Sequence, residues 1–123
     1  MKKVKAIRGA ICSQNNEIEI IKNVSDLCNQ IFIQNNLAEN DLISIFFSIT
    51  KEITVLNPAA ALRKGKSILD VSSTALFCCQ EAEIENGMKN TIRVMITAYM
   101  DEQSEKKNIY LNGAEKLRPD FAK

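Results

Sequence analysis

Residues 16–34 read NEIEIIKNVSDLCNQIFIQ, and apolar side chains recur in this stretch at a spacing of three or four positions. That spacing places them on one face of a helix. Asn16 can cap the helix, Glu19 stands at capping-box spacing from it, and Asn35-Asn36 can end it. The stretch therefore predicts a long amphipathic helix over 16–34, which must bury its apolar face against another layer. That face consists of Ile20, Ile21, Val24, Leu27, Cys28, Ile31 and Phe32.

The rest of the chain predicts one more helix and five strands. Asn57-Pro58 predicts a short second helix that continues to Lys64, and Gly65 can end it in the left-handed conformation. Alternation along 42–50 puts Ile43, Ile45, Phe47 and Ile49 on a buried face. The five predicted strands cover about 4–11, 42–50, 75–82, 91–100 and 108–111, the first interrupted at Arg8-Gly9 and the last able to continue past Gly113.

This order of elements predicts an α+β fold. One long and one short helix are expected to cover one face of a mixed five-stranded sheet. The other face keeps apolar side chains and needs cover, which indicates self-association, most simply as a closed ring. We expect residues 1–123 to form a single domain. Residues 117–123 lack hydrophobic periodicity and are predicted to be a mobile tail.

The charge pattern argues against nucleic acids and membranes as partners. The 16 basic and 15 acidic residues leave a net charge of +1, and no long block of Lys and Arg lies beside aromatic residues. The longest nearly apolar run, 42–49, is far shorter than a membrane span, and no signal-peptide pattern follows the basic N-terminus. We therefore expect a cytoplasmic protein.

The sequence contains no histidine, which restricts the chemistry that it can perform. Ser–His–Asp and Cys–His catalysis are excluded, as is most proton shuttling near neutral pH. Cys12, Cys28, Cys78 and Cys79 form no C-x-x-C pair, so we predict reduced cysteines that act as small hydrophobes and no metal site. An enzyme with this composition must use carboxylates, Lys, Tyr or thiols, or must act electrostatically without proton transfer.

Arginine is scarce, with 4 residues against 12 lysines. Because Arg differs from Lys mainly where a planar fork must hold an anion, the four arginines are candidates for special roles. Arg8 and Arg93 lie inside apolar strands. One interpretation is structural: each arginine forms an ion pair or lies at an edge with its charge in solvent. The other is functional: the two arginines converge on one anion-binding site.

Two further residues have both a structural and a functional interpretation. Glu81 follows an apolar strand, where it can pair with one of the arginines, orient a substrate hydroxyl or act as a general base. Tyr110 lies in the short strand before Gly113, where it is either a core residue or a phenol donor to a substrate carboxylate.

Six segments occur in an order and approximate spacing that point to one family. They are Ile7-Arg8-Gly9-Ala10, Asn57-Pro58-Ala59, Gln80-Glu81, Ile92-Arg93-Val94-Met95, Tyr110-Leu111 and Leu117-Arg118-Pro119-Asp120. Over about residues 4–121 the chain resembles the monofunctional trimeric bacterial chorismate mutases. The resemblance implies a pseudo-α/β-barrel homotrimer with sites between neighbouring subunits. It also implies a cofactor-free rearrangement of chorismate to prephenate, at the branch to phenylalanine and tyrosine.

The same resemblance implies roles for individual residues. Arg93 would donate to the ether oxygen of chorismate and to a carboxylate, while Glu81 and the backbone near Cys78 would hold the ring hydroxyl. Arg8 and Tyr110 would bind the side-chain carboxylate. The further substrate-binding residues implied are Asn57, Ala59, Arg63, Phe77, Leu117 and Arg118, with Arg63 and Arg118 nearer the entrance.

The chain departs from the family pattern at a few positions. Asn57 stands where an aromatic residue is common, and Phe77 replaces a small polar residue. Two rival functions remain open: a deaminase of reactive imines on a similar trimer, and a non-catalytic module that binds a small dicarboxylate. The spacing of Glu81 and Arg93 and the segment 117–120 favour the mutase.

Overall fold

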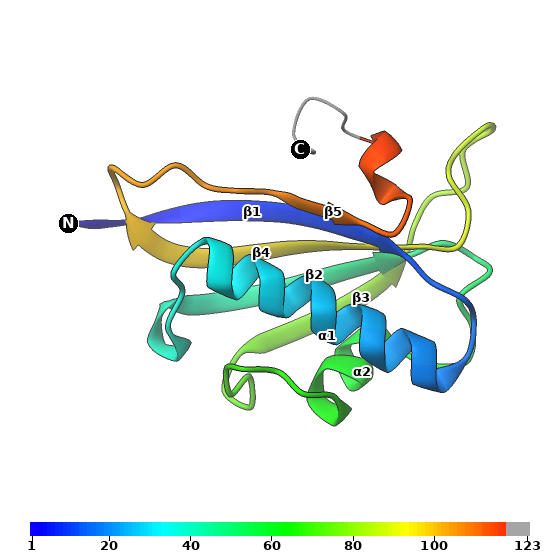
Figure 1. The fold of residues 1–123 in the computed structure, drawn as a ribbon, viewed down its shortest axis with the longest axis horizontal. Helices are drawn as coiled ribbons and strands as arrows, with labels where there is room; N and C mark the ends of the chain where they lie inside the picture. Colours follow the sequence, from blue (N-terminus) through cyan, green and yellow to red (C-terminus); the bar gives the residue numbers. More distant parts are fainter. Residues whose placement is uncertain (118–123) are drawn as a thin grey trace.

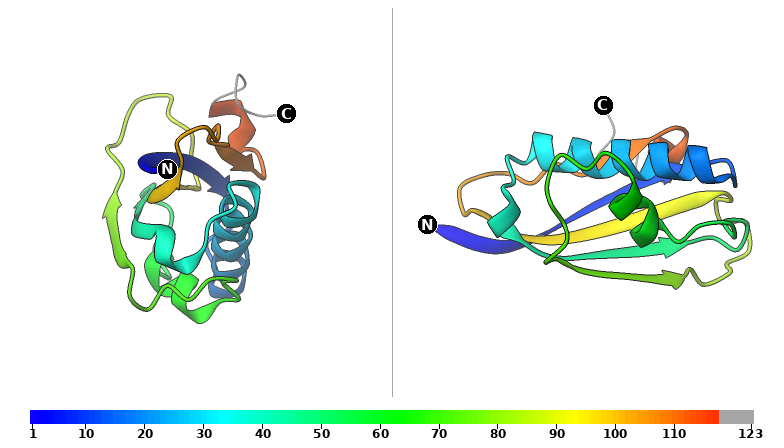
Figure 2. Two further views of the ribbon diagram at one scale, coloured as in Figure 1. Left: turned by 90° about the vertical axis from the view of Figure 1, so that its left-hand side faces the viewer. Right: turned by 90° about the horizontal axis from the view of Figure 1, so that it is seen from below.

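The computed structural model describes residues 1–117, which form a five-stranded sheet with both helices on one face (Figures 1 and 2). The strand order is β3-β2-β4-β1-β5, with β4 antiparallel to both β1 and β2, and with the β2–β3 and β1–β5 pairs parallel. The predicted α+β fold is therefore confirmed. Its elements are β1 (Lys2–Cys12), α1 (Glu17–Gln34), β2 (Leu42–Ile49), α2 (Pro58–Lys64), β3 (Ala75–Gln80), β4 (Thr91–Asp101) and β5 (Ile109–Leu111), with 3-10 helices η1 (Glu39–Asp41) and η2 (Ala114–Leu117).

Helix α1 confirms the prediction from its periodicity. The Asn16 side chain accepts a hydrogen bond from the Glu19 backbone N–H at 2.9 Å. Only this half of the predicted capping box forms. The Asn16 backbone N–H, which would donate to the Glu19 side chain in a capping box, donates instead to the Gln14 carbonyl at 3.0 Å. The predicted apolar face packs into the main core, where Val24, Leu27 and Ile31 are fully buried.

Helix α2 begins as predicted but ends differently. The Asn57 side chain accepts from the Ala59 N–H at 2.8 Å, and Pro58 is the first helical residue. Gly65 has φ −86° and ψ −164°, so the predicted left-handed ending was wrong. A side chain is excluded there by space, since an added Cβ would collide with the hydroxyl oxygen of Ser25 on α1.

Three strand predictions need correction. Ile43 is exposed, because β2 shifts its register against β4 between Leu42 and Ser44 and this irregularity turns Ile43 off the buried face. The first strand continues through Arg8-Gly9 without interruption, paired with β4 along its length. The last strand ends at Leu111, since the chain turns there into η2.

The sheet has a covered face and an open face. Residues 7, 11, 45, 47, 92 and 96 point toward the helices and are fully buried. The open face carries apolar side chains that are part-exposed in the single chain: Val4, Phe46, Phe77, Met95 and Tyr99. Within residues 1–117, no helix combines the length and apolarity needed to cross a membrane.

The contact between Gly65 and α1 yields a stability prediction. Replacing Gly65 with Ala should lower the free energy of unfolding by about 1–3 kcal/mol, because the added methyl group overfills the contact with Ser25. The Ser25 hydroxyl is buried and has no hydrogen-bond partner within residues 1–117, so Ser25→Ala alone should cost little or stabilise.

Urea unfolding of both single variants and the double variant measures this effect. Ser25→Ala should recover part of the stability lost in Gly65→Ala, because it removes the colliding oxygen. A Gly65→Ala variant as stable as the parent chain would contradict the packing described here.

Candidate active site

The strand register brings Arg8, Arg93 and Tyr110 together on the open face. Ala10 on β1 is the pairing partner of Arg93 on β4 and of Tyr110 on β5, and residues paired across strands point to the same face. Arg8 lies two positions before Ala10 on β1 and so shares this face. All three residues line one cavity of about 240 Å³, whose other walls include Phe46 and Ser48.

Glu81 holds Arg93 at the edge of this cavity. Arg93 Nε lies 2.7 Å from Glu81 Oε1, in an ion pair whose N–H is not aligned for a hydrogen bond. The Ser48 hydroxyl donates to the same Oε1 at 3.1 Å, and the Glu81 backbone N–H donates to the Ile49 carbonyl at 2.7 Å. Glu81 is thus fixed at both its backbone and its side chain. The predicted strand 75–82 was too long by two residues, because β3 ends at Gln80, directly before Glu81.

A second, larger cavity shares Arg93 with the first. It has a volume of about 840 Å³ and is lined by Glu81, Arg93, Leu117 and the loop of residues 82–89. Arg93 therefore stands between the two cavities. The side chain of Arg93 is 42% exposed although its Nε is buried, so the outer part of the guanidinium group is accessible for a ligand.

Other predicted site residues lie outside these cavities. Asn57 and Ala59 lie on α2, at its cap and buried in its first turn, and Arg63 lines a separate cavity of about 300 Å³ with Asp70 and Ser72. Helix α2 covers the face of the sheet opposite to Arg93 (Figure 2). One chain alone therefore does not gather the whole predicted set.

The two predicted β3 residues point in opposite directions. Phe77 lies on the open face, with its ring centroid 5.2 Å from that of Phe46. The Cys78 side chain packs against the main core on the covered face, so only its backbone is available to the open face. Arg118 lies outside the described residues.

The similarity of the chain to known protein families agrees with this geometry. The family described as chorismate mutase type I matches residues 4–121. The chain belongs to the type I chorismate mutases. This confirms the family that the sequence resembles, and the match extends over nearly the full length of the chain.

Individual chorismate mutases agree with the family match. Chorismate mutase AroH of Bacillus subtilis is 31% identical over 121 residues, which cover 97% of this chain and 93% of that protein. Chorismate mutase AroH of Thermus thermophilus is 26% identical, with 96% of each chain covered. The solved structure of a chorismate mutase from Clostridium thermocellum superposes with a TM-score of 0.80 at 33% identity, covering 91% of this chain and 98% of that one.

Two residues that line the smaller cavity were not predicted from the sequence. Phe46 forms an apolar wall, and Ser48 binds Glu81. The signal was present in the alternation of β2: if Ile45 and Phe47 face the core, then Phe46 and Ser48 must face the other way.

Two of the cysteines, Cys28 and Cys78, are poorly suited to nucleophilic chemistry near neutral pH. Burial raises the pKa of the Cys28 thiol to about 12, and the prediction of a small buried hydrophobe is confirmed there. Burial, together with the neighbouring Cys79, also raises the pKa of Cys78. Cys79 is exposed, so the same prediction was wrong for it. Among residues 1–117, no group of three or more His, Cys, Asp or Glu side chains could hold a metal ion.

The ion pair between Glu81 and Arg93 leads to a prediction on stability. Replacing Glu81 with Ala should lower the free energy of unfolding by about 1–3 kcal/mol, because it leaves the buried Arg93 Nε without its carboxylate partner. Glu83→Ala is the matched control, since Glu83 pairs with Lys51 at the surface and is 69% exposed. It should change stability by less than about 0.5 kcal/mol.

Urea titrations of the two variants at equal protein concentration compare these effects. Equal losses for Glu81→Ala and Glu83→Ala would show that the Arg93 pair is no more important than an ordinary surface ion pair.

Proposed function

We propose that this chain rearranges chorismate to prephenate in the two adjoining cavities that share Arg93. The observation that carries the proposal is the convergence of Arg8, Arg93 and Tyr110 on one cavity, with Arg93 held by Glu81. Membership of the type I chorismate mutases supports the activity and the substrate. The family match also favours this function over an imine deaminase or a non-catalytic dicarboxylate module.

Arg93 is the residue that we assign to the reacting bond. In this rearrangement the bond between the ether oxygen and the ring breaks ahead of carbon–carbon bond formation, so negative charge grows on the ether oxygen. A cation already fixed beside that oxygen stabilises the transition state more than the ground state. Because Glu81 engages Nε, the two Nη groups of Arg93 are the donors for the ether oxygen and a carboxylate.

Binding of the substrate follows from the remaining side chains of the cavity. The Arg8 guanidinium and the Tyr110 hydroxyl are donors for the side-chain carboxylate of chorismate, and Phe46 offers an apolar wall. Glu81 Oε1 already accepts from Ser48, but a carboxylate has further lone pairs with which it can accept from the ring hydroxyl. Holding both parts of the substrate in one reactive conformer supplies the rest of the rate enhancement.

We further propose that a neighbouring copy completes each site. Arg63, Asn57 and Ala59 belong to the substrate-binding set by family resemblance, yet within one chain they lie with α2 on the covered face. The part-exposed apolar residues of the open face favour burial against another subunit. A homotrimer with sites between its subunits is consistent with both observations. The single-domain organisation and the cytoplasmic location stay predictions.

The assigned role of Arg93 predicts the effect of its replacement. Arg93→Ala should lower kcat by more than the ~10²–10³-fold typical of removing one preorganised donor, because a full charge is lost. Arg93→Lys should also be poor, since an ammonium group cannot replace two forked donors. The assay follows the loss of chorismate absorbance, with prephenate confirmed as the product.

Lys51→Ala is the control for this experiment, because Lys51 is an exposed cation that lines the same larger cavity but pairs with Glu83. It should retain nearly normal turnover. If Arg93→Ala also turned over chorismate at a near-normal rate, the assignment of Arg93 to the ether oxygen would be wrong.

Association through the open face predicts a further result. Tyr99→Glu should yield a monomer by gel filtration and lose activity, because a carboxylate on this apolar face opposes burial. Tyr99 lines neither cavity that contains Arg93, so lost activity would reflect lost assembly. Ile18→Glu, at an exposed position on α1, should leave both properties intact. A fully active monomer would contradict the intersubunit site.

A further inference from the structure

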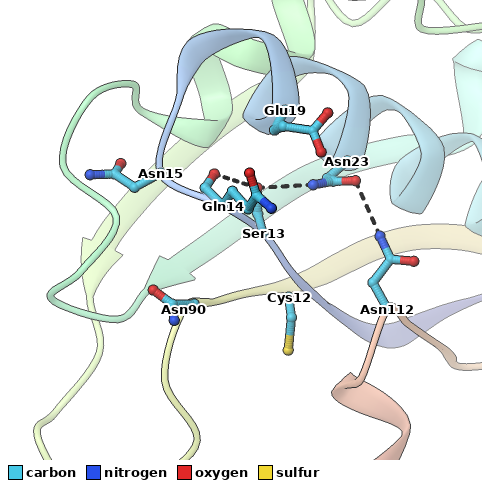
Figure 3. A pocket seen from close by; sticks show the side chains of 8 residues that line it. All are labelled: Cys12, Ser13, Gln14, Asn15, Glu19, Asn23, Asn90 and Asn112. Carbon is cyan, nitrogen blue, oxygen red and sulfur yellow. Dashed lines mark hydrogen bonds between the residues drawn. The ribbon is translucent and has the colours of Figure 1, made fainter.

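A polar network lies where the end of β1, the first half of α1 and the end of β5 meet (Figure 3). At its centre is Asn23, whose residue exposure is only 4%. The Asn23 Nδ2 donates to the Ser13 hydroxyl at 2.9 Å, and its Oδ1 accepts from Asn112 Nδ2 at 3.2 Å. Both ends of a buried amide are thus engaged, which is the condition under which burying it is tolerated.

The network joins the three strands that carry the candidate site. Ser13 directly follows β1, the strand of Arg8, and its backbone N–H donates at 2.9 Å to the carbonyl of Asn90, which directly precedes β4. Asn112 directly follows β5, the strand of Tyr110. The ends of β1 and β5 and the start of β4 therefore meet at one set of hydrogen bonds around the buried Ser13 and Asn23.

Asn112 also sets the direction of the chain after β5. Its φ is 52° and that of Gly113 is 99°, so two consecutive residues adopt left-handed conformations. This turn leads into η2, where Ala114 is fully buried against Ala10 and Tyr110 in a small apolar cluster that Leu117 also contacts. The hydrogen bond from Asn112 to Asn23 adds to the β5–β1 pairing and to this small cluster a direct link between the turn and α1.

We infer that Asn23 and Asn112 form a positioning pair that holds Tyr110 and Leu117 at the substrate site. Tyr110 lines the smaller cavity and Leu117 the larger one, and the segment between them is attached to α1 through this pair. The inference rests on the proposed function. Neither amide touches the reacting atoms, so the pair should act on substrate binding and leave the chemical step unaltered.

Asn112→Gly tests the pair because glycine tolerates the left-handed backbone and lacks the side-chain hydrogen bond, and Asn23→Ala removes the same bond without adding backbone freedom at residue 112. We expect KM for chorismate to rise by about twofold to tenfold, the range that corresponds to the net free energy of one hydrogen bond, with kcat within about twofold of the parent value. Asn23→Ala should raise KM in the same way. The double variant should raise KM no further than Asn23→Ala alone, because both changes remove the same bond.

Hydrogen exchange provides a readout that does not depend on turnover. Amide exchange in residues 109–117 should become faster in Asn112→Gly and also in Asn23→Ala, which leaves the backbone of this segment unchanged in sequence. Ser13→Ala is the matched control, since it removes the bond on the other side of Asn23 and leaves the Asn23–Asn112 bond in place. It should change neither KM nor exchange in 109–117 to a comparable extent.

Unchanged KM and unchanged exchange in Asn112→Gly would overturn the inference, as would an equal rise in KM for Ser13→Ala. If the parent chain showed no turnover of chorismate, the proposed function would fail, and exchange in residues 109–117 would still decide whether the pair holds this segment.

Discussion

The pairing of β1 with β4 is the constraint on which the rest of the molecule depends. Eleven consecutive residue pairs lock the two longest strands in antiparallel register. Because side chains alternate across a strand, this register decides that Ile7, Ile11 and Ile92 enter the core and that Arg8 and Arg93 do not. A slip of either strand by one residue would turn its own side chains over and direct its arginine into the core, so the hydrophobic effect that stabilises the core also sets the orientation of the charges.

The Arg93–Glu81 pair holds the guanidinium group of Arg93 in a fixed position and leaves its outer part accessible. The carboxylate contacts Nε and accepts a hydrogen bond from Ser48, and the Glu81 backbone is held by the Ile49 carbonyl at the end of β2. A fixed but accessible cation suits a reaction in which charge moves within one molecule and no proton is transferred. The absence of histidine from the sequence is compatible with such a reaction.

Local features of this fold could be predicted from the sequence, and long-range ones could not. Asn16 and Asn57 act through backbone groups two or three residues away, so their caps were visible in the chain itself. The exposure of Ile43 depends on a register shift against β4, and the lack of space for a side chain at Gly65 depends on the position of α1. For the site, strand alternation was enough to indicate Phe46 and Ser48. The sequence could not show that Arg63 and Arg93 line separate cavities, because this depends on how the helices and the sheet are layered in three dimensions.

The loop between Glu81 and Asn90 has both of its ends attached to the sheet. At its start the Glu81 N–H binds the Ile49 carbonyl, and at its end Asn90 accepts from the Ser13 N–H and donates to Glu52. Ile84, near its middle, is largely exposed. Because residues 82–89 also line the larger cavity, side-chain changes in this segment would alter the wall of that cavity without displacing the charged pair at its base. The loop is therefore a place where the fit of a bound molecule can be tuned while the position of Arg93 is preserved.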